Sequence, residues 1–133
     1  MTWYAAHLIQ YVRFLDGIQD RYPCYENVVL IEVSSVADAV ASAEDIGRAT
    51  YGADSGTGFT WDKRPAEWVF AGLRKLVECD DAGVSAPGAP DRYDADFRPG
   101  HGTEVTYSQI EVQTGQELID LVAGQSVRVL YDE

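Results

Sequence analysis

The stretch that decides the fold runs from residue 68 to residue 79 and reads Trp68-Val69-Phe70-Ala71-Gly72-Leu73-Arg74-Lys75-Leu76-Val77-Glu78-Cys79. Its alternate residues form two sets, and both begin apolar and become charged around Arg74 and Lys75. A run that is apolar on both faces is typical of a strand inside a sheet. We therefore predict the central strand of a small sheet, which leaves the core near Arg74. Gly72 predicts a bulge or the close approach of an aromatic ring.

Four further segments have the composition of strands. Residues 3–14 alternate between two sets of side chains, and residues 27–34 form a strongly apolar run. These two patterns predict a hairpin whose connection contains Asp16-Gly17. Residues 104–112 and 126–131 are rich in β-branched and aromatic types, which favours two more strands.

Two helices are predicted between these strands. Apolar residues recur at helical spacing from Val36 to Gly47, and either Ser34 or Ser35 can cap the first turn. The segment Thr114-Gly115-Gln116-Glu117 is a capping box that opens a second, short helix. The order ββαββαβ predicts an α+β fold, with a mostly antiparallel sheet of about five strands and two helices packed on one face.

The length of 133 residues predicts a single domain over residues 1–133. The acidic, proline-containing segment at about 80–102 shows no regular pattern and is interpreted as a loop insertion. The glycines between residues 51 and 64 lack the Gly-Lys-Ser/Thr ending of a phosphate-binding loop. An ordinary flexible connection is therefore expected there.

The formal charge of −12 is the strongest global signal. It argues against nucleic-acid binding, because phosphate contacts need clustered Lys and Arg and only ten basic residues face 22 acidic ones. It argues equally against an anionic membrane surface. A basic protein partner fits, since long-range attraction raises association rates roughly 10- to 1,000-fold. Solubility, or adaptation to a salty or acidic-proteome host, is the alternative explanation of the charge.

Two cysteines, Cys24 and Cys79, lack metal-site spacing and are interpreted as buried thiols. No signal peptide and no apolar run of membrane-spanning length are visible, so a cytoplasmic protein is expected. The two histidines, His7 and His101, lie in separate elements without a nucleophile signature. We therefore expect no enzymatic activity and no cofactor.

The candidate partner-binding residues combine carboxylates with aromatic anchors, which together supply steering and affinity. They are Asp80, Asp81, Asp91, Tyr93, Asp94, Asp96 and Phe97 in the acidic segment, and Trp61 in the glycine-rich connection. A solvated acidic loop is the plain alternative. A metal site that uses the same carboxylates and His101 is a third interpretation, but the spacing of a calcium loop is absent, so no metal site is predicted.

Four short motifs point to a family. They are Trp3-Tyr4-x-Ala6-x-Leu8-Ile9, Val29-Leu30-Ile31 before an alanine-rich helix, Trp68-x-Phe70-x-Gly72-Leu73, and Gly102-Thr103-Glu104-Val105-x-Tyr107. In this order, over roughly residues 3 to 112, they resemble a family of small bacterial proteins of unknown function. Related small acidic proteins are often encoded beside bacterial toxins as immunity factors, so the resemblance implies such a role. It implies no catalytic residues.

Three functions follow from these observations. The first is an immunity or inhibitor protein that occludes the active site of a basic toxin, such as a nuclease. The second is a structural or regulatory module that self-associates through its sheet. The third is a metal-dependent hydrolase that uses the acidic loop.

Overall fold

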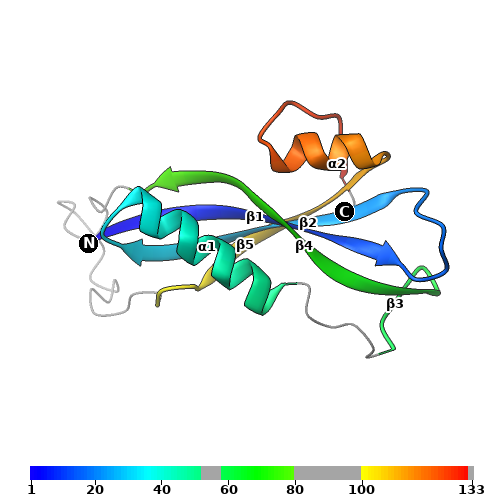
Figure 1. The fold of residues 1–133 in the computed structure, drawn as a ribbon, viewed down its shortest axis with the longest axis horizontal. Coiled ribbons are helices and arrows are strands. Elements are labelled where there is room, and N and C mark those ends of the chain that lie inside the picture. Colours follow the sequence, from blue (N-terminus) through cyan, green and yellow to red (C-terminus); the bar gives the residue numbers. More distant parts are fainter. Residues whose placement is uncertain (52–57, 80–99, 132–133) are drawn as a thin grey trace, which may run out of the picture.

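The computed structural model describes residues 1–51, 58–79 and 100–131 of the chain. This part forms a six-stranded antiparallel sheet with two helices, which confirms the α+β class (Figure 1). The elements are β1 (Thr2–Phe14), β2 (Tyr22–Val33), α1 (Val36–Thr50), β3 (Thr60–Trp61), β4 (Arg64–Glu78), β5 (Glu104–Val112), α2 (Gly115–Val122) and β6 (Leu130–Tyr131).

The strand order across the sheet is β3-β4-β1-β2-β5-β6. β1 pairs along its length with β2 on one side and with β4 on the other, so β1 is a central strand. β4 is flanked on its outer side only by the two-residue strand β3 in the described chain. The prediction of a central strand at residues 68–79 is therefore wrong in its position. An apolar pattern on both faces arises here because each helix packs beside β4, on opposite faces of the sheet.

Gly72 lies at an irregular point of β4, as its sequence position predicted. The register between β1 and β4 shifts on both sides of this region, between His7 and Leu8 and between Ile9 and Gln10. Gly72 has a φ of +148°, and a Cβ there would meet the Val122 side chain at 2.7 Å. The bulge is thus confirmed, and the close neighbour is a helix residue rather than an aromatic ring.

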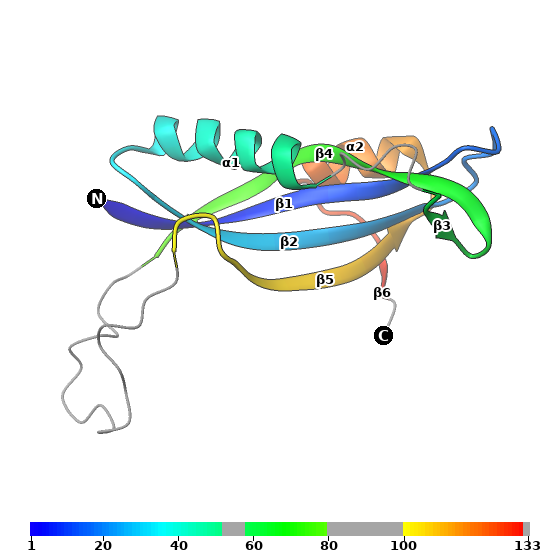
Figure 2. The ribbon, with the colours of Figure 1, turned by 90° about the horizontal axis from the view of Figure 1, so that it is seen from below.

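The two helices lie on opposite faces of the sheet (Figures 1 and 2). Leu8 of β1 belongs to the core cluster under α1, whereas the next residue, Ile9, belongs to the cluster under α2. Successive side chains of a strand point to opposite faces. The expectation that both helices share one face is therefore wrong. Helical periodicity shows which side of a helix is apolar, but not which face of the sheet receives it.

The predicted helix caps are confirmed. The Ser35 hydroxyl accepts a hydrogen bond of 3.1 Å from the Asp38 N–H at the start of α1. The Thr114 hydroxyl accepts one of 3.1 Å from Glu117 N–H at the start of α2. Gly124, with φ +80°, follows the end of α2. Arg74 of β4 donates to the backbone carbonyl of Leu121, so a charged residue that leaves the core serves to cap this helix.

The two edge strands of the sheet, β3 and β6, differ most from the expected pattern. Within residues 126–131 only Leu130 and Tyr131 form a strand, which pairs with the end of β5. A sixth strand arises because Thr60–Trp61 folds back on β4. The turn between them consists of Asp62 (φ +51°) and Lys63 (φ +65°). Such hairpin turns favour Asn-Gly or Asp-Gly, and Lys at the second position hides the signal.

Candidate binding surface

Of the eight predicted partner-binding residues, only Trp61 lies in the described part of the chain. The other seven belong to residues 80–99, outside that part: Asp80, Asp81, Asp91, Tyr93, Asp94, Asp96 and Phe97. Trp61 and its neighbours therefore define the candidate site in the described part of the chain.

Trp61 belongs to a linked group of aromatic residues in which Phe59 also contacts Trp68. We call four members of this group the aromatic surface: Tyr25, Trp61, Trp68 and Tyr107. Tyr25 lies at the centre and stacks on Trp68, with ring centroids 4.8 Å apart and planes 21° apart. Trp61 and Tyr107 approach Tyr25 edge-on, with centroids at 6.4 Å and 5.6 Å. Aromatic pairs prefer such offset and edge-to-face arrangements.

The aromatic surface lies on the same sheet face as α1. Tyr25 is opposite Gln10 in the β1–β2 register and opposite Gln109 in the β2–β5 register. Gln10 is also opposite Phe70, which packs under Gly47 near the end of α1. Because α1 ends at Thr50, the rows beyond this point have no helix above them in the described chain. Tyr107 lies on β5 in the row of Leu8 and Asn27, to the side of α1, and it is 60% exposed, a large value for an aromatic residue in a sheet.

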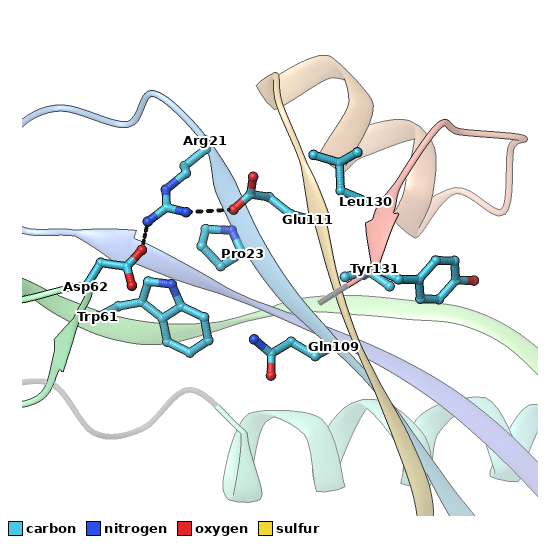
Figure 3. A pocket seen from close by; sticks show the side chains of 9 residues that line it. Arg21, Pro23, Trp61, Asp62, Gln109, Glu111, Leu130 and Tyr131 are labelled. Carbon is cyan, nitrogen blue, oxygen red and sulfur yellow. Dashed lines mark hydrogen bonds and ion pairs between the residues drawn. The ribbon is translucent and has the colours of Figure 1, made fainter. Parts of the chain in front are cut away.

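A pocket of about 240 Å³ opens beside Trp61, where β3, the start of β2, β5 and β6 meet (Figure 3). Its lining combines the Trp61 ring, aliphatic groups, an amide and three charged groups, and the Tyr131 ring points away from Trp61. The residues are Arg21, Pro23, Trp61, Asp62, Gln109, Ile110, Glu111, Leu130 and Tyr131. Most of its accessible lining is polar, and Trp61, Ile110 and Leu130 supply apolar contact.

The charges of this pocket are unequal. The Arg21 guanidinium donates to Glu111 Oε1 at 3.1 Å and to Asp62 Oδ2. One cation therefore stands against two carboxylates, and the group carries a formal charge of −1. The Arg21 side chain is 28% exposed and that of Asp62 is 59% exposed, so the site is accessible from water.

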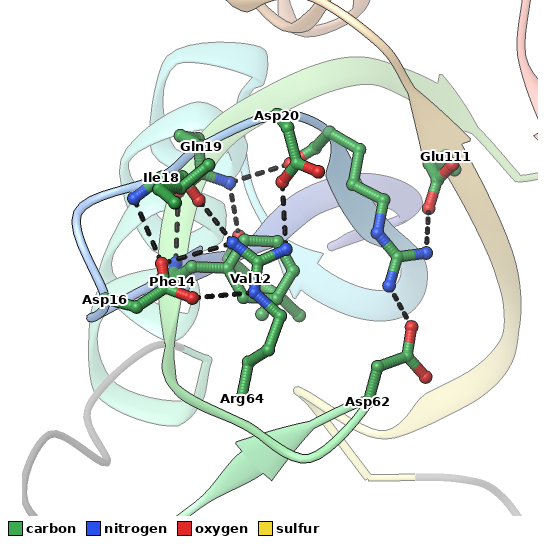
Figure 4. Close-up of polar contacts among 10 residues, drawn as sticks. Val12, Phe14, Asp16, Ile18, Gln19, Asp20, Asp62, Arg64 and Glu111 are labelled. Carbon is green, nitrogen blue, oxygen red and sulfur yellow. Dashed lines mark hydrogen bonds and ion pairs between the residues drawn. The ribbon is translucent and has the colours of Figure 1, made fainter.

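A second arginine holds the turn that carries Trp61 in place (Figure 4). Arg64 donates to Asp16 Oδ2 at 2.8 Å and to Asp20 Oδ1 at 2.8 Å, and its guanidinium carbon lies 3.6 Å from the Phe14 ring centroid. Hydrogen bonds from Arg64 lower the pKa of Asp16 and of Asp20. This clamp ties the β3–β4 hairpin to the β1–β2 connection and so fixes the rim of the candidate site.

A chain of polar side chains lies between the aromatic surface and α1. Gln10 Nε2 donates to Asn27 Oδ1 at 2.9 Å, and both residues are buried. Asn27 and the Tyr51 hydroxyl both donate to Glu104 Oε1. Burial, and then the Glu104 carboxylate, raise the pKa of Tyr51, so its hydroxyl remains a donor at neutral pH. The network satisfies the buried amides and orients Glu104 at the edge of the aromatic surface.

A second concavity lies on the opposite sheet face. This apolar groove of about 430 Å³ runs between α2 and the strands β1 and β4, and its lining is Tyr11, Val69, Phe70, Ala71, Leu118, Ile119 and Val122. It contains no charged group. The exposed side chain of Ile119 lies at its rim.

The remaining reactive side chains form no catalytic cluster in the described residues. His7 Nδ1 lies 3.1 Å from Glu26 Oε1, and His101 Nδ1 accepts from the Glu32 N–H at 3.0 Å. Both cysteines are free thiols, and Cys79 is only partly buried, contrary to expectation. Within residues 1–51, 58–79 and 100–131, no three His, Cys, Asp or Glu side chains gather as a metal site. Neither helix in this part is long and apolar enough to cross a membrane.

Sequence reasoning missed most of the aromatic surface. Trp68 and Tyr107 stand out in the sequence only as members of the motifs that resemble a family, and Tyr25 carries no separate signal. Their proximity depends on the pairing of β2 with β5, which are separated by about 80 residues of chain. A sequence pattern shows the face of each strand but not its neighbour.

Comparisons with known proteins identify a family but no function. No curated protein and no solved structure matches this chain. A family described as "Domain of unknown function (DUF4288)" matches residues 3–86, which include β1, β2, α1, β3 and β4. The predicted motif at residues 102–107 lies beyond the matched region. Because the match covers more than half of the 133 residues, the chain belongs to this family of domains of unknown function.

Proposed function

We propose that this chain is a non-catalytic binding protein for a basic protein partner, and more specifically an immunity or inhibitor protein that neutralises a bacterial toxin. The observation that supports the proposal is the aromatic surface on the sheet face that carries α1. Tyr and Trp are enriched among the residues that dominate binding energy in protein interfaces. The Tyr107 ring is exposed, and the other three rings are partly buried. With Glu104, Asp62 and Glu111 they offer a partner both apolar contact and negative charge.

The charge of the partner follows from electrostatics. The chain carries 22 acidic and ten basic residues. Five arginines in the described part are engaged with carboxylates or backbone carbonyls: Arg13, Arg21, Arg48, Arg64 and Arg74. The excess carboxylates generate a negative field that attracts a cationic surface. Nuclease active sites are cationic because their substrate is a polyanion, so a nuclease toxin is the partner class that this surface fits best.

The mechanism would be occlusion. Carboxylates of the chain would take the place of substrate phosphates, and an aromatic side chain would fill a pocket of the partner. Residues 80–99 supply further carboxylates in the sequence, and we keep the seven predicted binding residues there as part of this proposal.

The proposal is tested by co-expression with the product of the adjacent open reading frame. We expect a complex to co-purify and its association rate to fall steeply with added salt, because screening shortens the reach of the field to about 10 Å at 0.1 M salt. Absence of a complex, or an association rate insensitive to salt, would contradict it.

A second function has one observation in its favour. The residues of β5 from Glu104 to Ser108 are exposed, and no strand of the described chain pairs with its outer edge there. Unpaired edges are templates for pairing with another chain, which supports self-association through the sheet. Light scattering of the purified protein separates the two functions. A stable homo-oligomer without any hetero-partner would favour self-association.

A further inference from the structure

We infer that the pocket between Trp61 and Tyr131 takes a guanidinium group, namely an arginine side chain of the protein partner. This inference deepens the proposed function and rests on it for the source of the arginine. It concerns the pocket of about 240 Å³ beside the aromatic surface. Three independent features support it: the charge balance of the pocket, its aromatic wall, and the way the protein already holds its own arginines.

The charge balance favours a cation. Within the pocket, Asp62 and Glu111 share the single guanidinium of Arg21. Only one oxygen of Asp62 contacts Arg21. The second oxygen of this largely exposed side chain can accept from another donor. A second guanidinium would neutralise the remaining charge through charge-assisted hydrogen bonds, which are about twice as strong as neutral ones.

The walls favour a flat cation over a compact one. The Trp61 indole lies beside Pro23 and Gln109, with Leu130 and Tyr131 across the opening (Figure 3). A guanidinium is planar, weakly hydrated and stacks on aromatic faces, whereas an ammonium is strongly hydrated. The Trp61 ring therefore favours an arginine side chain over a lysine side chain.

The protein uses the same arrangement internally. Arg64 lies over the Phe14 ring at 3.6 Å while it donates to two aspartates. Arg21 lies 5.9 Å from the same ring and contacts two carboxylates. Both sites combine one guanidinium, one aromatic ring and two acids. For an arginine from outside, the pocket offers Trp61 as the ring and the second oxygen of Asp62 as the acceptor, while Arg21 shares the two acids.

The experiment uses the isotope-labelled full chain and the peptide acetyl-Gly-Gly-Arg-Gly-Gly-amide. Two control peptides carry citrulline, a neutral group of the same shape, or lysine. We expect saturable chemical-shift changes at the Trp61 indole N–H and at the amides of Glu111 and Tyr131. The citrulline peptide should bind about tenfold more weakly, the loss expected for a charge-assisted hydrogen bond.

Two variants of the pocket and one control variant localise the binding site of the peptide. Asp62→Asn removes one charge, and asparagine tolerates the left-handed conformation that Asp62 adopts (φ +51°). We expect it to weaken the arginine peptide about three- to tenfold. Asp45→Asn removes the same charge from an exposed position on α1 and should leave the affinity unchanged. Glu111→Gln tests the second carboxylate, and the dispersion of the spectra shows that each variant is folded.

Equal binding of the arginine and citrulline peptides, or shifts confined to other residues, would overturn the inference. If the arginine peptide binds but no basic protein partner is found, the guanidinium selectivity of the pocket stands and the proposed function is removed. A partner whose affinity is unchanged by Asp62→Asn and Glu111→Gln would keep the proposed function and remove this inference.

Discussion

Gly47 shows how a single residue couples a helix to the sheet. It lies in the last turns of α1, fully packed, and a Cβ at this position would overlap the Phe70 ring. Glycine in a helix costs about 1 kcal/mol relative to alanine. The packing of α1 against the Phe70 ring offsets this cost, because only glycine lets the helix approach β4 this closely.

We predict that Gly47→Ala destabilises the protein by about 1–3 kcal/mol in urea unfolding, the usual cost of overpacking a core. At an exposed helical position the same change would be stabilising. In a Phe70→Leu background, which removes the ring, Gly47→Ala should become neutral or favourable. A stabilising effect of Gly47→Ala in the original chain would show that α1 does not lie against Phe70.

The two thiols should differ in reactivity. Burial raises the pKa of Cys24 to about 12, so at pH 8 only about one thiol in ten thousand is ionised. Cys79 is partly exposed. We expect a disulfide reagent to modify one thiol per folded chain and two per unfolded chain. The Cys79→Ser variant should lose the reactive thiol of the folded protein, and rapid modification of that variant would contradict the burial of Cys24.

At the scale of elements, the Arg64 clamp links the β3–β4 hairpin to the β1–β2 connection. Its two acids have folded-state pKa values below their usual 3.8. The unfolded chain therefore binds protons more readily than the folded chain in acid. The stabilisation by these ion pairs is present above about pH 4 and is lost as the pH falls through the lowered folded-state pKa values.

We predict that Arg64→Gln lowers the unfolding free energy at pH 7, and that the difference from the original chain shrinks as the pH falls below about 4. Denaturant titrations across pH 2–7 measure it. Lys75→Gln removes one positive charge from an exposed β4 position and serves as the control for net charge. A difference between Arg64→Gln and the original chain that stays constant down to pH 2 would rule out the clamp as its source.

The elements also show what the sequence could and could not predict. Local signals were sufficient for β1, α1, β5 and α2, because alternation and capping boxes act within a few residues of chain. The placement of α2 on the second face and the partial exposure of β4 depend on contacts between distant segments. β3 was missed because its turn uses Asp62 and Lys63 rather than glycine.

At the scale of the whole molecule, charge and topology act together. In the described part of the chain, α1 covers part of one sheet face, and the aromatic surface lies near the end of that helix, with Tyr107 to its side on β5. Trp61 could be proposed as an exposed anchor from its glycine-rich, charged surroundings alone. Its neighbours Tyr25, Trp68 and Tyr107 could not, because strand order brings them together. The net charge of −12 is the reason for proposing a cationic partner for this surface.

The whole-molecule field predicts how the association rate depends on ionic strength. Between about 0.02 M and 0.5 M salt, we expect the rate constant for a basic partner to fall at least about tenfold, with a smaller change in the dissociation rate. Stopped-flow fluorescence at several salt concentrations measures both rates. Salt dependence carried mainly by dissociation would show that buried contacts rather than long-range attraction dominate.

The measurement that tests the central claim most directly is amide hydrogen exchange of the chain alone and in complex with the product of the adjacent reading frame. The claim is that the aromatic surface and its pocket form the partner interface. We predict new protection at Trp61 and Asp62 and along residues 104–109, with α2 unchanged. Protection confined to α2 and its apolar groove, or to residues 80–99 alone, would contradict it.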